Sequence, residues 1–480
     1  MKVNLSSNMS HRWLTLSGIL CAGLLSACSS VPVQSGKAAA QLQTAWVVMG
    51  EQGQAVARAV TTDAVCPAIS QDGVTQLMSV RAPAEVLAQR KTASKPDDSK
   101  ASAFPVLTCE ATIAPATRIA SIVGRELPLP KAVAQKIVVI GDTGCRMKLA
   151  DNYFQSCNDS EKWAFRQMVE TAAKFQPDLV VHVGDYHYRE NACPDGNPAC
   201  GGSPWGYGWD TWQADFFSPA NALLKAAPWV VVRGNHESCL RAGQGWWRLM
   251  DPRPLVSGRD CNLEQNDQAG DYSAPYAIPL GKVGSEQAQL IVFDSSKVPN
   301  KVLAKTDRAY QVYMEQFNTV NQLAEQADFN IFMNHHPILG FAVEKKKNGE
   351  LATYPGNAAL QDVMQQINPT RLFPSKVQAV LSGHVHLFEA LTFSTDHPTQ
   401  FVSGNGGSSL DMMLPTPLPA GATPFSAAKL EHFSNSNDVG FMTMERELQG
   451  WKIQAWNKQG KQIADCRMQN KKTNCTQLAP

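Results

Sequence analysis

Five short polar motifs, each directly after an apolar run of strand length, constrain the fold of this chain more than any other feature. Every motif carries Asp, Asn or His, residues that bind hard metal ions. One Gly-Asp or Gly-Asn would be an ordinary turn signal, but five in the same position after strands are not. The motifs and their runs are Gly141-Asp142-Thr143-Gly144 after 136–140, Gly184-Asp185-Tyr186-His187-Tyr188 after 179–183, Gly234-Asn235-His236-Glu237 after 229–232, His335-His336-Pro337 after 330–333, and Gly383-His384-Val385-His386 after 377–381.

Segments with helical apolar spacing alternate with these strands, and further strands follow towards the carboxyl terminus. This alternation indicates an α/β layered core. Polar residues that follow successive strands of such a core meet at the carboxyl edge of the sheet, where active sites lie. The predicted helices are 161–175, 211–226, 306–326 and 358–366, and the predicted later strands are 401–403, 440–446, 451–456 and 461–467.

The amino terminus has the pattern of an export signal. Lys2 and Arg12 precede the apolar stretch 14–25, which is too short to span a bilayer and has the length of a signal-peptide core. It ends at Leu25-Ser26-Ala27-Cys28, which resembles the lipobox of bacterial lipoproteins, with an ordinary cleaved signal as the alternative. We predict a signal peptide over 1–27, lipidation of Cys28, a linker over 28–40, and export to the periplasmic side of the outer membrane or the cell surface.

The region after the linker differs in character from the rest of the chain. Residues 41–130 contain short strand-like runs separated by Gly, Pro and Asp, with one helical stretch at 83–90. Short strands at this spacing are typical of a small β-sandwich. We therefore predict a β-sandwich domain over 41–130 and the catalytic domain, with its terminal strands, over 131–480.

Charge and cysteine content restrict partners and compartment. The formal net charge of +1 falls to −1 when Lys2 and Arg12 leave with the signal, and the longest basic run is Lys345-Lys346-Lys347, so we expect no nucleic-acid binding. Apart from Cys21 and Cys28, ten cysteines remain, an even number that predicts disulfides in an oxidising compartment. The simplest pairing is Cys66–Cys109, Cys145–Cys157, Cys193–Cys200, Cys239–Cys261 and Cys466–Cys475.

The order and content of the motifs resemble the metallophosphoesterase (calcineurin-like) superfamily, most closely its purple acid phosphatase branch. The usual first motif of the superfamily is D-x-H, whereas this chain has Gly144 at the third position. The D-x-x-Y spacing of the branch is present from Asp185 to Tyr188. The resemblance covers about 141–386 and implies a four-layer α/β/β/α core with two central sheets, here preceded by the β-sandwich.

The resemblance also implies a centre of two metal ions. A phenolate favours a trivalent ion, so the first metal would be Fe(III), and the neutral ligands of the second suit Fe(II), Zn(II) or Mn(II). Two such ions can activate a water as a hydroxide nucleophile, and His236 would protonate or stabilise the leaving-group oxygen. The implied ligands are Asp142, Tyr188 and His386 for the first metal, Asn235, His335 and His384 for the second, and Asp185 as the bridge.

Several neighbouring residues keep two interpretations. His187 is an alternative metal donor to Tyr188, and Glu237 either orients His236 or caps a helix. The aromatic stretches 204–217 and 243–247 either close a core or form the rim of the active site. Candidate contacts to the substrate are His336, Arg241 and Arg248.

The predicted function is phosphomonoester hydrolysis by a lipid-anchored, dinuclear-metal enzyme. A phosphodiesterase or nucleotide pyrophosphatase acting on the same metals is one alternative, because the fold and the metal ligands do not set substrate choice. A surface protein that binds metal without catalysis is another. A positioned acid such as His236 favours the enzymes over the binding protein. The sequence leaves the natural substrate and the oligomeric state open.

Overall fold

Two large β-sheets pack against each other through a shared apolar core, and helices cover the outer face of each. The computed structural model describes residues 41–415, 417–469 and 472–478. Val139, Val181 and Val183 of the first sheet share the central core with Leu290 and Ile331 of the second. The order of the layers is therefore helix, sheet, sheet, helix.

The first sheet has eleven strands, and its central strands β11, β14, β15 and β1 run parallel. The terminal strands pair antiparallel on one side of this parallel block. In spatial order the strands are β28 (Lys472–Gln477), β27 (Gln462–Gln469), β26 (Gly450–Asn457), β25 (Gly440–Glu447), β11 (Lys136–Ile140), β14 (Leu179–His182), β15 (Trp229–Val231), β1 (Leu42–Met49), β2 (Ala55–Thr61), β8 (Leu107–Ile113) and β5 (Ser79–Ala82).

The second sheet has seven strands, with β17, β18, β21 and β23 parallel. Its order is β16 (Tyr276–Val283), β17 (Glu286–Val292), β18 (Phe329–Met333), β21 (Val377–Ser382), β23 (Thr399–Ser403), β22 (Phe388–Phe393) and β24 (Leu430–Ser436). All five strands predicted to precede the motifs are present, each within one residue of its predicted bounds.

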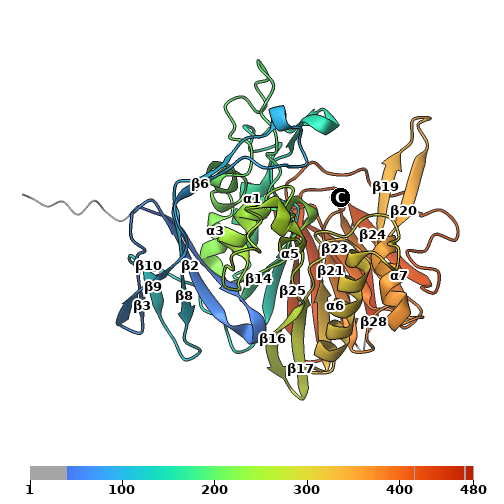
Figure 1. Ribbon diagram of the computed structural model, residues 1–480. Coiled ribbons are helices and arrows are strands. Elements are labelled where there is room, and N and C mark those ends of the chain that lie inside the picture. The colour runs from blue at the N-terminus through green and yellow to red at the C-terminus, as the bar shows by residue number, and fades with distance from the viewer. Residues whose placement is uncertain (1–40, 416, 470–471, 479–480) are drawn as a thin grey trace, which may run out of the picture. The chain divides into compact units, whose positions relative to one another are not determined.

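The longest helices lie over the second sheet, where α6 and α7 pack on its outer face (Figure 1). The predicted helix at 211–226 is broken into α2, a π-helical turn at Gln213–Phe217, and α3. The Asn357 side chain caps α7 by accepting from Leu360 N at 3.0 Å. The helices are α1 (Phe165–Ala173), α2 (Trp209–Trp212), α3 (Asn221–Ala226), α4 (Gly243–Gly245), α5 (Asp267–Gly270), α6 (Arg308–Ala324) and α7 (Ala358–Ile367).

The amino-terminal β region is joined to the rest of the fold through the first sheet. Strand β1 runs parallel to β15, with Val48 opposite Trp229, so β1, β2, β8 and β5 continue the first sheet. Both faces of β1 are buried, because Val47 joins the core between the sheets and Trp46 joins the outer core. A strand covered on both faces belongs inside a layered sheet. A four-stranded sheet packs on this extension, so the amino-terminal β region shares one sheet with the strands that carry the motifs.

Smaller sheets complete the described chain. The prediction of a helix at 83–90 is wrong, because the strand β6 forms there and pairs antiparallel with β7. The Lys345–Lys347 triplet leads into the turn of the β19–β20 hairpin. The bounds are β3 (Ala68–Gln71), β4 (Val74–Leu77), β9 (Ala120–Ile122), β10 (Arg125–Glu126), β6 (Glu85–Leu87), β7 (Ser102–Phe104), β12 (Met147–Lys148), β13 (Tyr153–Phe154), β19 (Phe341–Lys345) and β20 (Leu351–Pro355).

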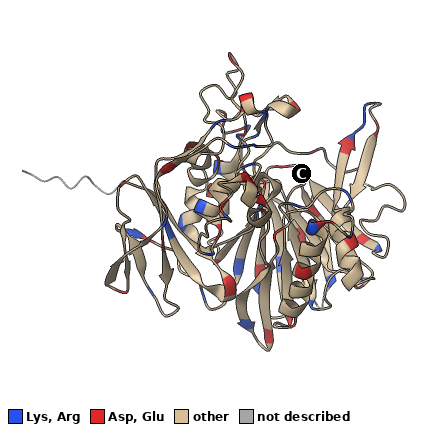
Figure 2. Ribbon diagram, in the orientation of Figure 1, with Lys and Arg blue, Asp and Glu red and all other residues tan. Residues whose placement is uncertain are grey.

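Disulfides cross-link the fold, and all five predicted pairs are formed. Their number indicates an extracytoplasmic location, because such bonds persist in oxidising compartments. Among the described residues, no helix is long and apolar enough to cross a membrane. The predicted signal peptide and the predicted linker, Cys28 included, lie outside the described residues. Basic and acidic residues are interspersed along the described part of the chain (Figure 2).

Candidate metal centre

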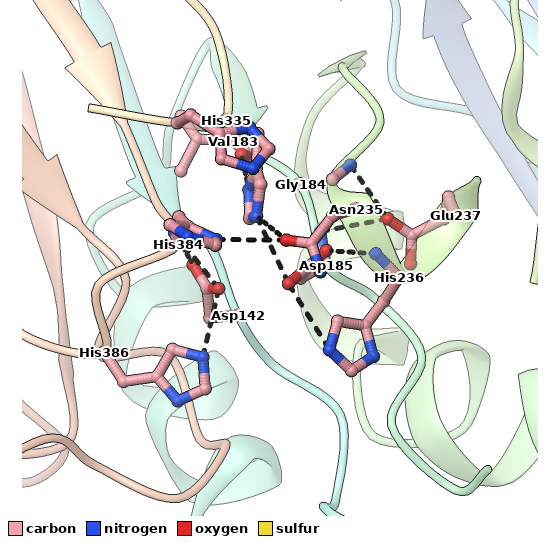
Figure 3. A network of polar contacts seen from close by, with 12 residues as sticks. Asp142, Val183, Gly184, Asp185, Asn235, His236, Glu237, His335, His384 and His386 are labelled. Atoms are coloured by element: carbon pink, nitrogen blue, oxygen red, sulfur yellow. Dashed lines mark hydrogen bonds and ion pairs between the residues drawn. The ribbon is translucent and has the colours of Figure 1, made fainter. Parts of the chain in front are cut away.

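The loops that follow β11, β14 and β15 of the first sheet meet the loops that follow β18 and β21 of the second (Figure 3). Each loop delivers at least one of the predicted metal ligands, and the structure brings all seven together. They form two groups of contacts, which Asp185 joins.

The first group surrounds the hydroxyl of Tyr188. This oxygen lies 3.0 Å from Asp142 Oδ1, 2.9 Å from Asp185 Oδ2 and 2.9 Å from His386 Nε2. His386 Nε2 in turn lies 3.3 Å from Asp142 Oδ1. The far nitrogen of His386 contacts the backbone oxygen of Ser409, which sets the ring orientation. A phenol, two carboxylates and an imidazole thus face one point.

The second group surrounds the amide oxygen of Asn235. His335 Nε2 lies 3.2 Å from Asn235 Oδ1, and His384 Nδ1 lies 3.0 Å from the same atom. His335 Nε2 also lies 3.2 Å from Asp185 Oδ2, and its Nδ1 faces the Val183 carbonyl at 2.9 Å. Donor atoms of Asp185, His335 and His384 all fall within 4.8 Å of one another. Spacing this small suits ligands of one ion.

The backbone at three of these ligands is left-handed. Asp142, Asp185 and His384 have φ values of 55°, 59° and 69°. Such conformations in non-glycine residues cost free energy and cluster at functional sites, where the surrounding structure holds them. They turn the chain sharply at the end of β11, β14 and β21, which directs the side chains towards one another.

Two glycines allow the motif loops to approach closely. A Cβ atom on Gly234 would lie 1.9 Å from Asp185 Oδ1, so only glycine fits beside this carboxylate. A Cβ on Gly144 would lie 2.7 Å from the Tyr186 carbonyl oxygen and 2.9 Å from both Tyr188 N and Asp215 Oδ2. The space that a side chain at position 144 would need is therefore filled by the loop that carries Tyr188.

Glu237 organises the second motif. Its carboxylate accepts hydrogen bonds from the backbone nitrogens of Asp185, Tyr186, His187 and Gly234, at 3.0, 2.8, 3.2 and 2.9 Å. The bond to Gly234 also caps the turn Asn235–Glu237. Of its two predicted roles, Glu237 therefore has the capping one, and it also holds the backbone of Asp185 in place.

Two acidic residues near the centre have roles that the motifs do not indicate. Asp215 is buried and accepts from the backbone nitrogens of Cys145, Tyr188 and Arg189, at 3.0, 2.7 and 3.1 Å. Arg189 Nε neutralises it at 2.6 Å. Asp215 thus fixes the backbone beneath Tyr188.

The second of these residues is Glu190, which supports His236. Glu190 Oε1 lies 2.9 Å from His236 Nδ1 and 3.5 Å from Arg241 Nη1. The backbone nitrogen of His236 donates to Asp185 Oδ1 at 2.9 Å, and its ring lies 4.0 Å from the ring of Tyr188, centre to centre. His236 therefore lies beside the cluster, and the Glu190 carboxylate contacts its ring at Nδ1.

The remaining candidates divide between the site and the core. His336 packs 4.2 Å from His384, ring centre to ring centre, and its Nδ1 lies 3.1 Å from Ser295 Oγ. His187 is buried against Tyr207, and Arg248 binds Glu85 at 2.6 Å, so neither side chain reaches the cluster. The aromatic stretches supply the outer core under the first sheet, through Trp209, Trp212, Phe216, Phe217, Trp246 and Trp247.

The ionisation of the cluster reflects burial and close pairing. Burial raises the pKa of Asp142 above its ordinary value. Burial would also raise the pKa of Asp185, but His335 and His236 outweigh it and hold this pKa well below the ordinary value. Burial lowers histidine pKa values, yet Asp185 raises that of His335 to about 9, and Asp142 raises that of His386 to about 9. A metal cation bound to these donors would displace such protons, because metal ligands bind deprotonated.

The donor set fits metal ions of the kind that the sequence implies. It consists of carboxylate, phenol, amide and imidazole groups without sulfur, which suits iron, zinc or manganese. Asp142, Asp185 and His335 are buried, Asn235 and His384 are partly exposed, and the donor atoms lie within contact distance of one another across two sheets. The residues are therefore compatible with two metal ions that share Asp185.

Comparison with known proteins agrees with this geometry. A purple acid phosphatase from yellow lupin (Lupinus luteus) seeds is similar in fold, with a TM-score of 0.51 and 14% identity over 90% of this chain and 74% of that chain. The structure of PhoD is similar with a TM-score of 0.52 and 12% identity over 91% of this chain and 92% of that one. No curated protein matches in sequence. The calcineurin-like phosphoesterase profile matches residues 135–388, more than half of the chain, and this protein therefore belongs to the calcineurin-like phosphoesterase family.

Proposed function

We propose that the protein hydrolyses phosphate monoesters at a dinuclear metal centre. The observation that supports this most directly is the contact of the Tyr188 hydroxyl with Asp142, Asp185 and His386, next to the Asn235, His335 and His384 group. Membership of the family makes a metal-dependent phosphoester hydrolase the starting point. The Tyr188 arrangement favours a purple acid phosphatase-like member of it.

Each group of contacts would hold one ion. Asp142, Tyr188 and His386 offer two anionic donors and suit Fe(III), whereas Asn235, His335 and His384 are neutral and suit Fe(II), Zn(II) or Mn(II). Asp185 touches both groups and would bridge the ions. When bound, such a pair of cations supplies Lewis acidity towards phosphate oxygens and lowers the pKa of water.

His236 and its neighbours would act on the proton of the leaving group. Burial and Arg241 lower the pKa of His236 to about 4, although Asp185 and Glu190 oppose this. The free imidazole is therefore neutral at pH 7, and Glu190 favours its proton on Nδ1. An anionic phosphate nearby would raise this pKa again, since an opposite charge favours the protonated ring. His236 would then donate to the leaving oxygen or stabilise its charge.

Turnover of a phosphate monoester and of a diester, each with and without a chelator, tests the proposal. We expect hydrolysis of phenyl phosphate to exceed that of bis(phenyl) phosphate, and chelation to abolish it. Preference for the diester would instead favour a phosphodiesterase or nucleotide pyrophosphatase on the same residues. Metal binding without turnover of either ester would favour a non-catalytic surface protein.

The site of action is proposed to be the periplasmic side of the outer membrane or the cell surface. The five disulfides support an oxidising compartment. The Leu25-Ser26-Ala27-Cys28 sequence supports a lipid anchor on Cys28, which would place the enzyme at the membrane without a spanning helix.

A further inference from the structure

A cavity of about 460 Å³ opens beside the candidate metal centre. His384, a proposed metal ligand, and His336 form its inner wall, and the β19–β20 hairpin forms its outer wall. Figure 1 shows this hairpin extending beyond the ends of the strands of the second sheet. The cavity is therefore continuous with the place where a phosphoryl group would bind.

The lining of the cavity is mostly apolar. Phe341 and Val385 are buried in the core behind it, whereas Tyr354 is 44% exposed. Ala342 and Tyr354 are opposite each other in the hairpin register, and both line the cavity. Residues paired in this way present their side chains on one face of a hairpin. The small Ala342 leaves room beside the Tyr354 ring.

The charge of the lining limits what can enter. Glu344 is the one charged side chain among the described lining residues, and it is exposed. The neighbouring polar groups are the amides Asn300 and Asn357 and the two imidazoles. With no Lys or Arg in this lining and a carboxylate at the opening, a leaving group that carries further phosphates would be repelled.

We propose that this cavity binds the alcohol portion of the substrate, and that it selects uncharged aromatic or apolar leaving groups through Ala342 and Tyr354. The volume lies within the range of pockets that enclose small organic ligands. The Tyr354 ring offers a stacking surface, and Ala342 sets the free width of the pocket. This inference rests on the proposed phosphomonoesterase function and specifies its substrate class.

The test compares 2-naphthyl phosphate with methyl phosphate in the metal-loaded enzyme. Ala342→Trp should fill the cavity and lower kcat/KM for the naphthyl ester by about 10- to 100-fold, with little change for the methyl ester. Leu351→Trp is the matched control, because Leu351 is exposed on the same hairpin but does not line the cavity. Inhibition by inorganic phosphate should be equal in all three proteins.

Binding of 2-naphthol to the metal-free protein, followed by fluorescence, gives a readout apart from activity. The wild type and Leu351→Trp should bind, whereas Ala342→Trp should not. Equal losses for both esters, or naphthol binding by Ala342→Trp, would overturn the inference. Naphthol binding that depends on Ala342, in a protein that hydrolyses neither ester, would instead refute the phosphomonoesterase proposal and leave the cavity assigned to an aromatic alcohol.

Discussion

A Cβ atom on Gly144 would lie 2.9 Å from the backbone nitrogen of Tyr188, so the glycine of the first motif and the tyrosine of the second belong to one arrangement. The superfamily that the motifs resemble usually carries a histidine at the position of Gly144. Here the Tyr188 hydroxyl lies in contact with Asp142 and Asp185. In this chain the second loop supplies a side chain to the cluster through Tyr188, whereas the first loop has none at position 144.

Gly144→Ala should displace the Tyr188 loop. The added methyl would lie 2.7 Å from the Tyr186 carbonyl oxygen, which is backbone and cannot move alone. We expect a loss of about 1–3 kcal/mol in the free energy of unfolding, typical of overpacking, together with weaker metal binding. Denaturant unfolding and metal analysis measure these effects. Gly50→Ala is the control, since its Cβ would make only ordinary contacts from 3.4 Å outwards.

Tyr188→Phe should preserve the fold and remove the colour of the iron-loaded protein. Only a hydroxyl is lost, but a phenolate on Fe(III) gives a charge-transfer band in the visible spectrum. Metal in the first position should bind more weakly, because it would lose the phenolate oxygen that lies beside the donors of Asp142, Asp185 and His386. Tyr313→Phe, equally buried under the second sheet, should keep the band. A colourless wild type with full activity in Tyr188→Phe would refute the purple acid phosphatase-like assignment.

His236→Ala should keep its metal and lose turnover by about 10²–10⁴-fold for esters with poor leaving groups. The loss should be smaller for good leaving groups, which need less help from an acid. Glu190→Gln should give a milder loss, because the amide keeps the contact with Nδ1 but no longer favours the protonated ring. Metal content, and the turnover of aryl phosphates that differ in their leaving groups, measure these effects in both variants. Loss of metal from His236→Ala would identify His236 as a ligand instead.

Cys28→Ser tests the anchor. Without the thiol no lipid can be attached, so the protein should remain uncleaved at this site or pass to the soluble fraction. Membrane fractionation and mass measurement of the amino terminus follow the outcome. A protein that stays with the membrane after removal of residues 1–27 and of the Cys28 thiol would disprove the lipobox interpretation.

The strands that carry the motifs could be predicted because each is a short apolar run that ends at a polar turn. Which strands pair with them in the sheets could not be predicted. Strand β1 has the continuous apolar character of a strand buried on both faces, but its pairing with β15 joins residues far apart in sequence. The sequence predicts a helix where β6 lies, because this strand forms by pairing with β7, and a polar segment separates the two in sequence.

The candidate site also has residues that the sequence predicts and residues that only the structure identifies. Residues in the motifs could be named from order and spacing, and all seven proposed ligands come together. Asp215 and Glu190 could not be named, since their roles arise from contacts with Tyr188 and His236 that only the fold creates. Arg248 shows the reverse, because it is near His236 in sequence but binds Glu85 of the amino-terminal region.

Glu389→Gln should change how stability depends on pH. Glu389 is fully buried on β22, where it accepts from Phe341 N at 3.1 Å, and burial raises its pKa to about 8. The folded protein therefore keeps a proton that the unfolded chain releases near pH 4.5. Stability from this group is present below that pH and is lost as pH rises towards 8.

The wild type should thus lose about 1.4 kcal/mol of unfolding free energy per pH unit, relative to Glu389→Gln, between roughly pH 5 and 8. Glutamine cannot ionise and keeps an oxygen for Phe341 N, so the variant should be the more stable protein at pH 8. Urea unfolding of both proteins at several pH values measures the difference, in which all other titrating groups cancel. Parallel pH profiles of the two proteins would show that folding does not raise the pKa of Glu389, and would contradict this prediction.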